Sequence, residues 1–109
     1  MAYNEETAAR IRQHLQAYGD AITEKKMFGG LCFLYHGKMS VGIVKEELCV
    51  RVLAPKDQQE LHKAHVRPMD FTGKPMKEMI FVEPAGFQSE AALGYYILLG
   101  IEHAESKLG

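Results

Sequence analysis

The side chains best suited to covalent chemistry in this chain of 109 residues are two cysteines and five histidines. A catalytic cysteine needs a histidine or a helix N-terminus to activate its thiolate, and neither Cys32 nor Cys49 is predicted to lie where a helix begins. His62 and His65 are the only close histidine pair, and their i, i+3 spacing on a short surface helix offers at most two metal ligands. No paired-carboxylate, G-x-S-x-G or H-E-x-x-H pattern of the common hydrolytic enzymes occurs. We therefore expect no catalytic residue, no metal site and no cofactor.

Non-covalent binding is the alternative, and Arg51 is the best candidate for it. If successive strands are joined by two-residue turns, Phe33, Ser40 and Arg51 share one row across three strands. An arginine beside an aromatic ring and a small residue could grip a carboxylate, a phosphate or a partner's side chain, because its planar guanidinium binds bidentately and stacks. In the simpler interpretation, Gly42 admits a packed helix and Arg51 pairs with an acid such as Glu83.

The charge pattern suggests one further surface. With 13 lysines and arginines against 14 acids, the net charge of −1 provides no overall field that would attract DNA. Residues 62–77 are locally basic, and we call them the basic strip. A solvated loop is the simpler interpretation, and nucleic-acid binding is the alternative. The basic side chains of the strip, set against Asp70 alone, are His62, Lys63, His65, Arg67, Lys74 and Lys77.

The composition is that of an ordinary folded domain. A hydrophobic content of 47% with 25% charged residues excludes a disordered or fibrous chain. The length fits a single domain over residues 1–109. The longest apolar runs, residues 31–35 and 79–82, are much shorter than the about 20 residues that cross a bilayer. Two cysteines without C-x-x-C spacing suit a reducing compartment, so we expect a cytoplasmic domain without a membrane segment.

Helices are predicted at both ends of the chain, with strands between them. Asn4 is a good N-cap for an amphipathic helix that ends near Gly19, and Ser89 caps a second helix. The apolar stripe of this second helix is Leu93, Ile97, Gly100/Ile101, Ala104 and Leu108. The pattern further predicts a short helix over 55–64 and strands over 22–28, 31–35, 38–44, 47–53, 69–72 and 78–83.

The pair His36-Gly37 predicts a tight hairpin turn, which in turn predicts the two faces of the sheet. In this register Cys32 and Cys49 lie on opposite faces, so we expect no disulfide between them. The expected core face consists of Cys32, Leu34, Met39, Val41, Ile43, Leu48, Val50 and Val52. The expected opposite face consists of Leu31, Phe33, Tyr35, Ser40, Gly42, Val44, Cys49 and Arg51.

The corner formed by Met27, Phe28, Gly29 and Gly30 is the most distinctive structural motif. It lacks the pattern of a phosphate-binding loop, so we interpret it as a strand corner that needs glycine for a bend or a close approach. Together with later motifs it resembles the TfoX N-terminal domain family over about residues 10–105. The matching segments, in chain order, are Lys26-Met27-Phe28-Gly29-Gly30, Phe33, Gly37-Lys38-Met39, Leu48-x-Val50-Arg51-Val52 and Phe71-x-Gly73-Lys74.

This resemblance implies an α+β fold, in which N- and C-terminal helices pack on an antiparallel sheet of about five to six strands, similar in type to secretion-chaperone domains. The competence regulators that give the family its name act in transcriptional control of DNA-uptake genes and carry a second, helical C-terminal domain, which we do not expect here. We therefore expect a small, stand-alone bacterial module, either regulatory or protein-interacting, that binds a protein partner. A homodimer, nucleic-acid binding through the basic strip, and a small acidic ligand at Arg51 remain open alternatives.

Overall fold

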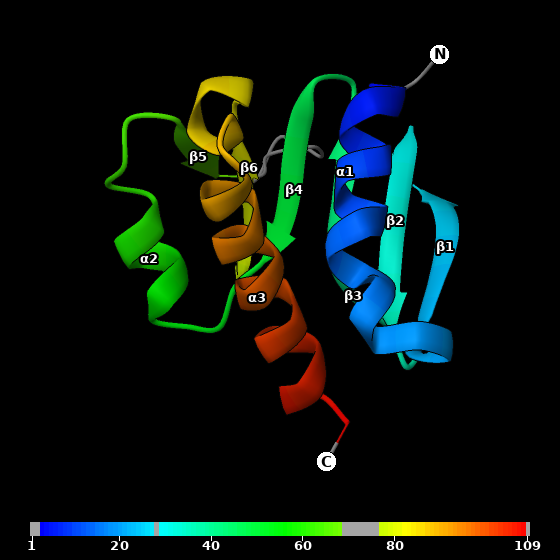
Figure 1. Ribbon diagram of the computed structural model, residues 1–109. Coiled ribbons are helices and arrows are strands. Elements are labelled where there is room, and N and C mark those ends of the chain that lie inside the picture. Colours follow the sequence, from blue (N-terminus) through cyan, green and yellow to red (C-terminus); the bar gives the residue numbers. More distant parts are fainter. Residues whose placement is uncertain (1–2, 28, 69–76, 109) are drawn as a thin grey trace.

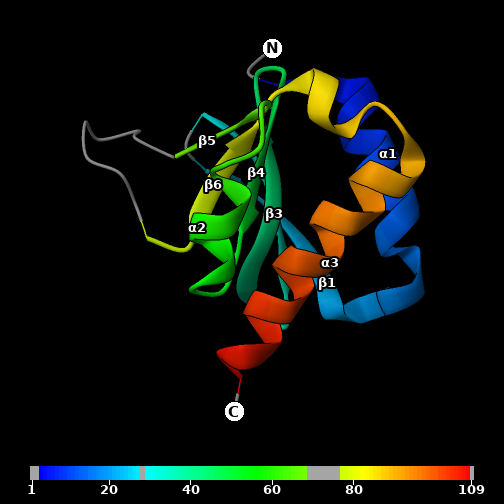
Figure 2. The same cartoon turned by 90° about the vertical axis from the view of Figure 1, so that its left-hand side faces the viewer.

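The computed structural model, which describes residues 3–27, 29–68 and 77–108, has one antiparallel sheet covered by helices on one face (Figure 1). The strands lie in the order β1-β2-β3-β4-β6-β5. Figure 2 shows the sheet nearly edge-on, with α1 and α3 on the same side of it. The elements are α1 (Glu5–Leu15), a 3-10 helix η1 (Gln16–Ala21), β1 (Ile22–Met27), β2 (Gly30–Tyr35), β3 (Lys38–Val44), β4 (Glu47–Arg51), α2 (Lys56–Glu60), β5 (Val66–Pro68), β6 (Met79–Val82), a 3-10 helix η2 (Pro84–Phe87) and α3 (Glu90–Ser106). The predicted α+β fold is confirmed.

Local capping and turn chemistry explains most element boundaries. The Asn4 side chain accepts a hydrogen bond from the Thr7 amide at 3.0 Å, and the Ser89 hydroxyl accepts one from the Ala92 amide at 3.0 Å. Each side chain thereby satisfies an amide that has no partner within its helix. His36 and Gly37 both adopt positive φ, 49° and 83°, as the tight turn between β2 and β3 requires.

The described glycines of the predicted corner have two different roles. Gly29 has φ 73°, in the left-handed region that disfavours side chains. Gly30 approaches the neighbouring strand so closely that a Cβ atom there would lie 2.2 Å from the Ile43 carbonyl oxygen. Glycine is therefore required at both positions. Phe28 and the predicted strand over 69–72 lie outside the described residues.

The predicted register between β2 and β3 is wrong beyond the turn. Leu34 pairs with Met39 as expected, but Phe33 pairs with Val41, so Ser40 is an extra residue on β3. Such a bulge moves every later residue of one strand by one position relative to its partner. Phe33 therefore lies on the helix-covered face, and Cys32 lies on the opposite face.

The main core fills the space between this face of the sheet and the helices α1 and α3. It takes side chains from α1, five strands and α3; the fully buried members include Ile11, Phe33, Val41, Ile43, Leu48, Val50, Ile80, Val82 and Leu93. A smaller apolar cluster occupies the opposite face and consists of Val44, Cys49, Met79 and Phe81, with Met39 packed against it. One member of the predicted stripe of the C-terminal helix, Leu108, is 45% exposed instead.

The two cysteines lie on the same face, not on opposite faces as predicted, because both pair with Gly42 of the strand between them. Two strand spacings of about 4.8 Å still separate their backbones by more than the about 7 Å that a disulfide can span. Both thiols are free and buried. Burial raises the pKa of Cys32 to about 11 and that of Cys49 to about 12.

Candidate functional site

The predicted row of Phe33, Ser40 and Arg51 does not form. Phe33 and Ser40 are both 0% exposed, because the bulge turns the phenylalanine ring into the main core. The Ser40 hydroxyl donates to the Phe33 carbonyl at 2.8 Å, and the Ser40 backbone packs against Gly100 of α3. Neither side chain has surface with which to contact a partner, so Arg51 alone remains of the predicted site.

Arg51 is the last residue of β4 and is half-buried. Its Nη2 atom lies 3.4 Å from His103 Nε2. No carboxylate of the described residues forms an ion pair with Arg51, and the acid expected from the sequence, Glu83, lies 3.7 Å from His65 instead. Each of the other three arginines has such a carboxylate: the pairs are Arg10–Glu90, Arg12–Glu24 and Arg67–Glu47.

His103 lies between Arg51 and an acid. It lies on the inner side of α3, is 2% exposed, and its Nε2 is 3.0 Å from Glu78 Oε1. An ionised carboxylate only accepts, so we assign the hydrogen to Nε2. Nδ1 is then a bare acceptor, and it is buried without a hydrogen-bond partner among the described residues. Burial lowers the pKa of His103, although the bond to Glu78 acts in the opposite direction.

Glu78 stands at the centre of these contacts. Besides His103, its carboxylate accepts from the Ala54 amide at 3.2 Å and lies 3.7 Å from Lys107 Nζ. These neighbours, His103 first, lower the pKa of Glu78. Its own amide donates to Asp57 Oδ2 at 3.0 Å. The residue has φ 61°, a strained backbone conformation for a non-glycine residue that persists only where its surroundings hold it in place.

A cavity of about 520 Å³ opens beside Glu78. Its walls come from the segment after β4, the start of α2 and the turn before β6. The lining residues are Ala54, Pro55, Asp57, Gln58, Lys77 and Glu78. Charged side chains from separate segments therefore meet at this end of the sheet.

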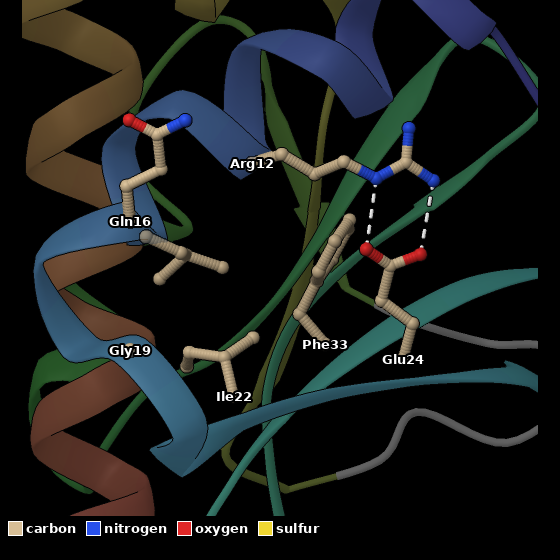
Figure 3. Close-up of a pocket in the computed structure, with 7 residues that line it drawn as sticks. Arg12, Gln16, Gly19, Ile22, Glu24 and Phe33 are labelled. Carbon is tan, nitrogen blue, oxygen red and sulfur yellow. Dashed lines mark hydrogen bonds and ion pairs between the residues drawn. The ribbon is translucent and has the colours of Figure 1, made fainter.

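A second hollow, of about 270 Å³, lies between α1, η1 and β1 (Figure 3). Leu15, Ile22 and Phe33 supply its apolar lining. On the rim, Arg12 donates two parallel hydrogen bonds to Glu24, at 2.8 and 2.9 Å. This mutual bonding raises the pKa of the arginine and lowers that of the glutamate. The rim charges thus satisfy each other and hold the edge strand β1 against α1.

Two of the described cations of the basic strip, Arg67 and Lys63, are also occupied. Arg67 is bound by Glu47 through two hydrogen bonds and lies over the Phe81 ring at 4.6 Å. Lys63 Nζ is 2.9 Å from Glu60 Oε1 and also contacts Tyr95. Lys74 lies outside the described residues. Within the part of the chain that the structure describes, no three His, Cys, Asp or Glu side chains form a metal-binding group, and no helix is long and apolar enough to span a bilayer.

Sequence reasoning missed His103, Glu78 and Asp57. The only readable signal was the position of His103 within the apolar stripe of the C-terminal helix, one residue before Ala104. Glu78 was the first residue of a predicted strand, and Asp57 fell in the first turn of a short helix, where an acid is common. Their proximity arises only from the pairing of β4 with β6 and the packing of α3.

The fold and this site define a small α+β domain with a polar site at one end of its sheet. A family model described as the TfoX N-terminal domain matches residues 13–104, so the chain belongs to the TfoX N-terminal domain family. It is thus a domain of the competence-regulator type. No curated protein matches the sequence.

Proposed function

We propose that this chain is a non-catalytic regulatory module of the cytoplasm that binds a protein partner through Arg51. One observation supports this proposal above all: Arg51 is the one arginine among the described residues that no carboxylate pairs. A half-buried guanidinium has lost part of its hydration without gaining an ion pair. A carboxylate supplied by a partner would complete it with two parallel, charge-assisted hydrogen bonds.

The charges around Arg51 favour an acidic occupant. Lys107 Nζ lies 3.7 Å from the carboxylate of Glu78, the acid that binds His103. Burial lowers the pKa of His103, so its ring is uncharged at neutral pH. Glu78, the closest acid, already accepts from His103. The occupant we propose is therefore an acidic side chain or a terminal carboxylate of another protein. A role in transcriptional control is part of the proposal and rests on family membership alone.

Nucleic acid is the weaker candidate. Duplex binding draws its affinity from several phosphate contacts at once. In this chain the net charge is −1, and Lys63 and Arg67 of the basic strip are already paired with glutamates. A single unpaired arginine suits one carboxylate better than a line of phosphates.

The test compares affinity capture by the wild type, Arg51→Gln, Arg51→Lys and the control Arg12→Gln, followed by calorimetry with the purified partner. Loss of charge-assisted bonds worth about 1.5–3 kcal/mol predicts that Arg51→Gln weakens binding by about tenfold or more. Arg51→Lys keeps the charge but not the planar fork, so it should bind with intermediate affinity. Arg12→Gln should bind as the wild type does, because Arg12 is engaged by Glu24.

Circular dichroism confirms that each variant is folded before binding is compared. A dimer in light scattering that Arg51→Gln dissociates would identify the partner as a second copy of the chain. A partner that binds the folded Arg51→Gln variant as tightly as the wild type would refute the proposal. Recovery of nucleic acid with salt-sensitive binding would favour the alternative at the basic strip.

A further inference from the structure

The cavity beside Glu78 has the dimensions and the lining of a small-ligand site. It measures about 520 Å³. Sites for small molecules typically enclose about 300–1,000 Å³. Two of its lining residues are acids, Asp57 and Glu78, and one is a lysine, Lys77. The cavity is separate from the Arg51 site, because Arg51 is not among its lining residues.

Asp57 supplies an acceptor that the protein leaves unused. Its side chain is 4% exposed. One oxygen, Oδ2, accepts from the Glu78 amide at 3.0 Å and from Gln58 Nε2 at 3.5 Å. The other oxygen, Oδ1, is buried and accepts no hydrogen bond from the described residues. Buried carboxylates in proteins are normally paired with a cation or fully hydrogen-bonded, so Asp57 needs a donor from elsewhere.

Glu78 supplies a second acceptor on the same cavity wall. Its Oε1 accepts from His103, whereas among the described residues Oε2 receives only the 3.2 Å bond from the Ala54 amide. A carboxylate oxygen has two lone pairs, so Oε2 retains accepting capacity. The strained backbone at Glu78, with φ 61°, directs its amide to Asp57 and so ties the two acids together.

We propose that this cavity binds a small molecule carrying an ammonium group, with Asp57 as the main anchor and Glu78 as the second acceptor. An ammonium group brings three donors and a positive charge, which match the two carboxylate side chains. A divalent metal fits less well, because no three His, Cys, Asp or Glu side chains of the described residues form a metal-binding group. Lys77 is exposed on the rim, so a ligand with a carboxylate at its other end, such as a free amino acid, is favoured over a simple amine.

The experiment uses the full chain and four kinds of probe. Free amino acids carry both charges, ethylamine carries only the ammonium group, N-acetylated amino acids lack it, and succinate carries only carboxylates. Thermal shifts at about 10 mM probe, followed by calorimetry, should show binding of amino acids and weaker binding of ethylamine, without binding of the acetylated probes or succinate.

Three variants identify the anchor. Asp57→Asn should weaken amino acid binding about tenfold or more, because the amide replaces a charged acceptor but can still cap the Glu78 amide. Lys77→Gln, on the exposed rim, should weaken binding of amino acids but not of ethylamine. Lys38→Gln, at an exposed lysine outside the cavity, is the matched control and should change neither affinity.

Three results would overturn the proposal: no thermal shift with any amine, equal binding of free and acetylated amino acids, or unchanged binding by folded Asp57→Asn. Should Asp57→Asn fail to fold, Lys77→Gln and the acetylated probes still decide the question. The Arg51→Gln variant should bind these probes as the wild type does. This separates failure of the cavity from failure of the protein-binding function.

Discussion

The substitution Gly100→Ala tests how closely α3 must approach the sheet to form the candidate site. A Cβ atom on Gly100 would lie 2.5 Å from the Ser40 carbonyl oxygen and 2.7 Å from Val41 Cγ1. Ordinary contact begins at 3.4 Å, so α3 would have to move away by about 0.9 Å. Rotamer changes cannot relieve a clash with backbone. Overpacking a core lowers the free energy of unfolding by about 1–3 kcal/mol, and we expect the upper part of this range here. Alanine favours the helix over glycine, which offsets about 1 kcal/mol of this loss.

The expected net loss is about 1–2 kcal/mol, or a fall in Tm of about 4–8 °C. Gly94→Ala on the same helix is the matched control, because its Cβ would meet only a side chain, the His14 ring, at 3.3 Å and no backbone atom. That variant should be as stable as the wild type or more stable by up to about 1 kcal/mol. Urea denaturation, monitored by circular dichroism, measures the free energy of unfolding of both variants. Equal stabilities of the two variants would refute the proposed close packing of α3 on β3.

Further predictions concern titration, thiols and the strand corner. The folded state lowers the pKa of His103 by burial, so its contribution to stability is complete above its ordinary pKa of 6.5 and declines as the pH falls below that value. The urea midpoint of unfolding should therefore decrease as the pH is lowered from about 7.5 to 5, and this decrease should be smaller in His103→Gln. Because burial raises the pKa of Cys32 to about 11 and that of Cys49 to about 12, Ellman's reagent at about pH 8 should react only after unfolding. Gly30→Ala, with its Cβ 2.2 Å from the Ile43 carbonyl oxygen, should lower the free energy of unfolding by about 2–3 kcal/mol in the same urea assay.

Elements determined by their own residues could be predicted from the sequence. The caps at Asn4 and Ser89 and the turn at His36-Gly37 depend on a side chain or a backbone angle within a few residues. The strands between these points follow from their length and apolar content. Such short-range interactions leave a pattern that can be read in one dimension.

The faces of the sheet could not be predicted correctly, because they depend on a bulge that long-range packing stabilises. Ser40 is the extra residue, its hydroxyl donates to the Phe33 carbonyl of the neighbouring strand, and its backbone packs closely against Gly100 of α3. Nothing near Ser40 in the chain distinguishes this arrangement from a regular hairpin. A one-residue shift exchanges the two faces of a strand, so one bulge was enough to misplace Phe33 and Cys32.

Arg51 was predicted from the sequence as a candidate binding residue, but its lack of a carboxylate partner among the described residues is visible only in space. The carboxylate partners of the other arginines are Glu90, Glu24 and Glu47. All three lie 12 or more residues away in the chain, so no spacing rule distinguishes a paired arginine from an unpaired one. Once these pairs are known, Arg51 and Asp57 stand out among the described residues, because both lie close to Glu78 and each has bonding capacity that its neighbours leave unused. Arg51 has no carboxylate partner among the described residues and lies beside His103, which bonds to the Glu78 carboxylate. One oxygen of Asp57 has no donor among the described residues, while the other accepts from the Glu78 amide. Opposite unmet charges joined through one strained residue are what a stable scaffold would avoid, and this argues that function maintains them at this end of the sheet.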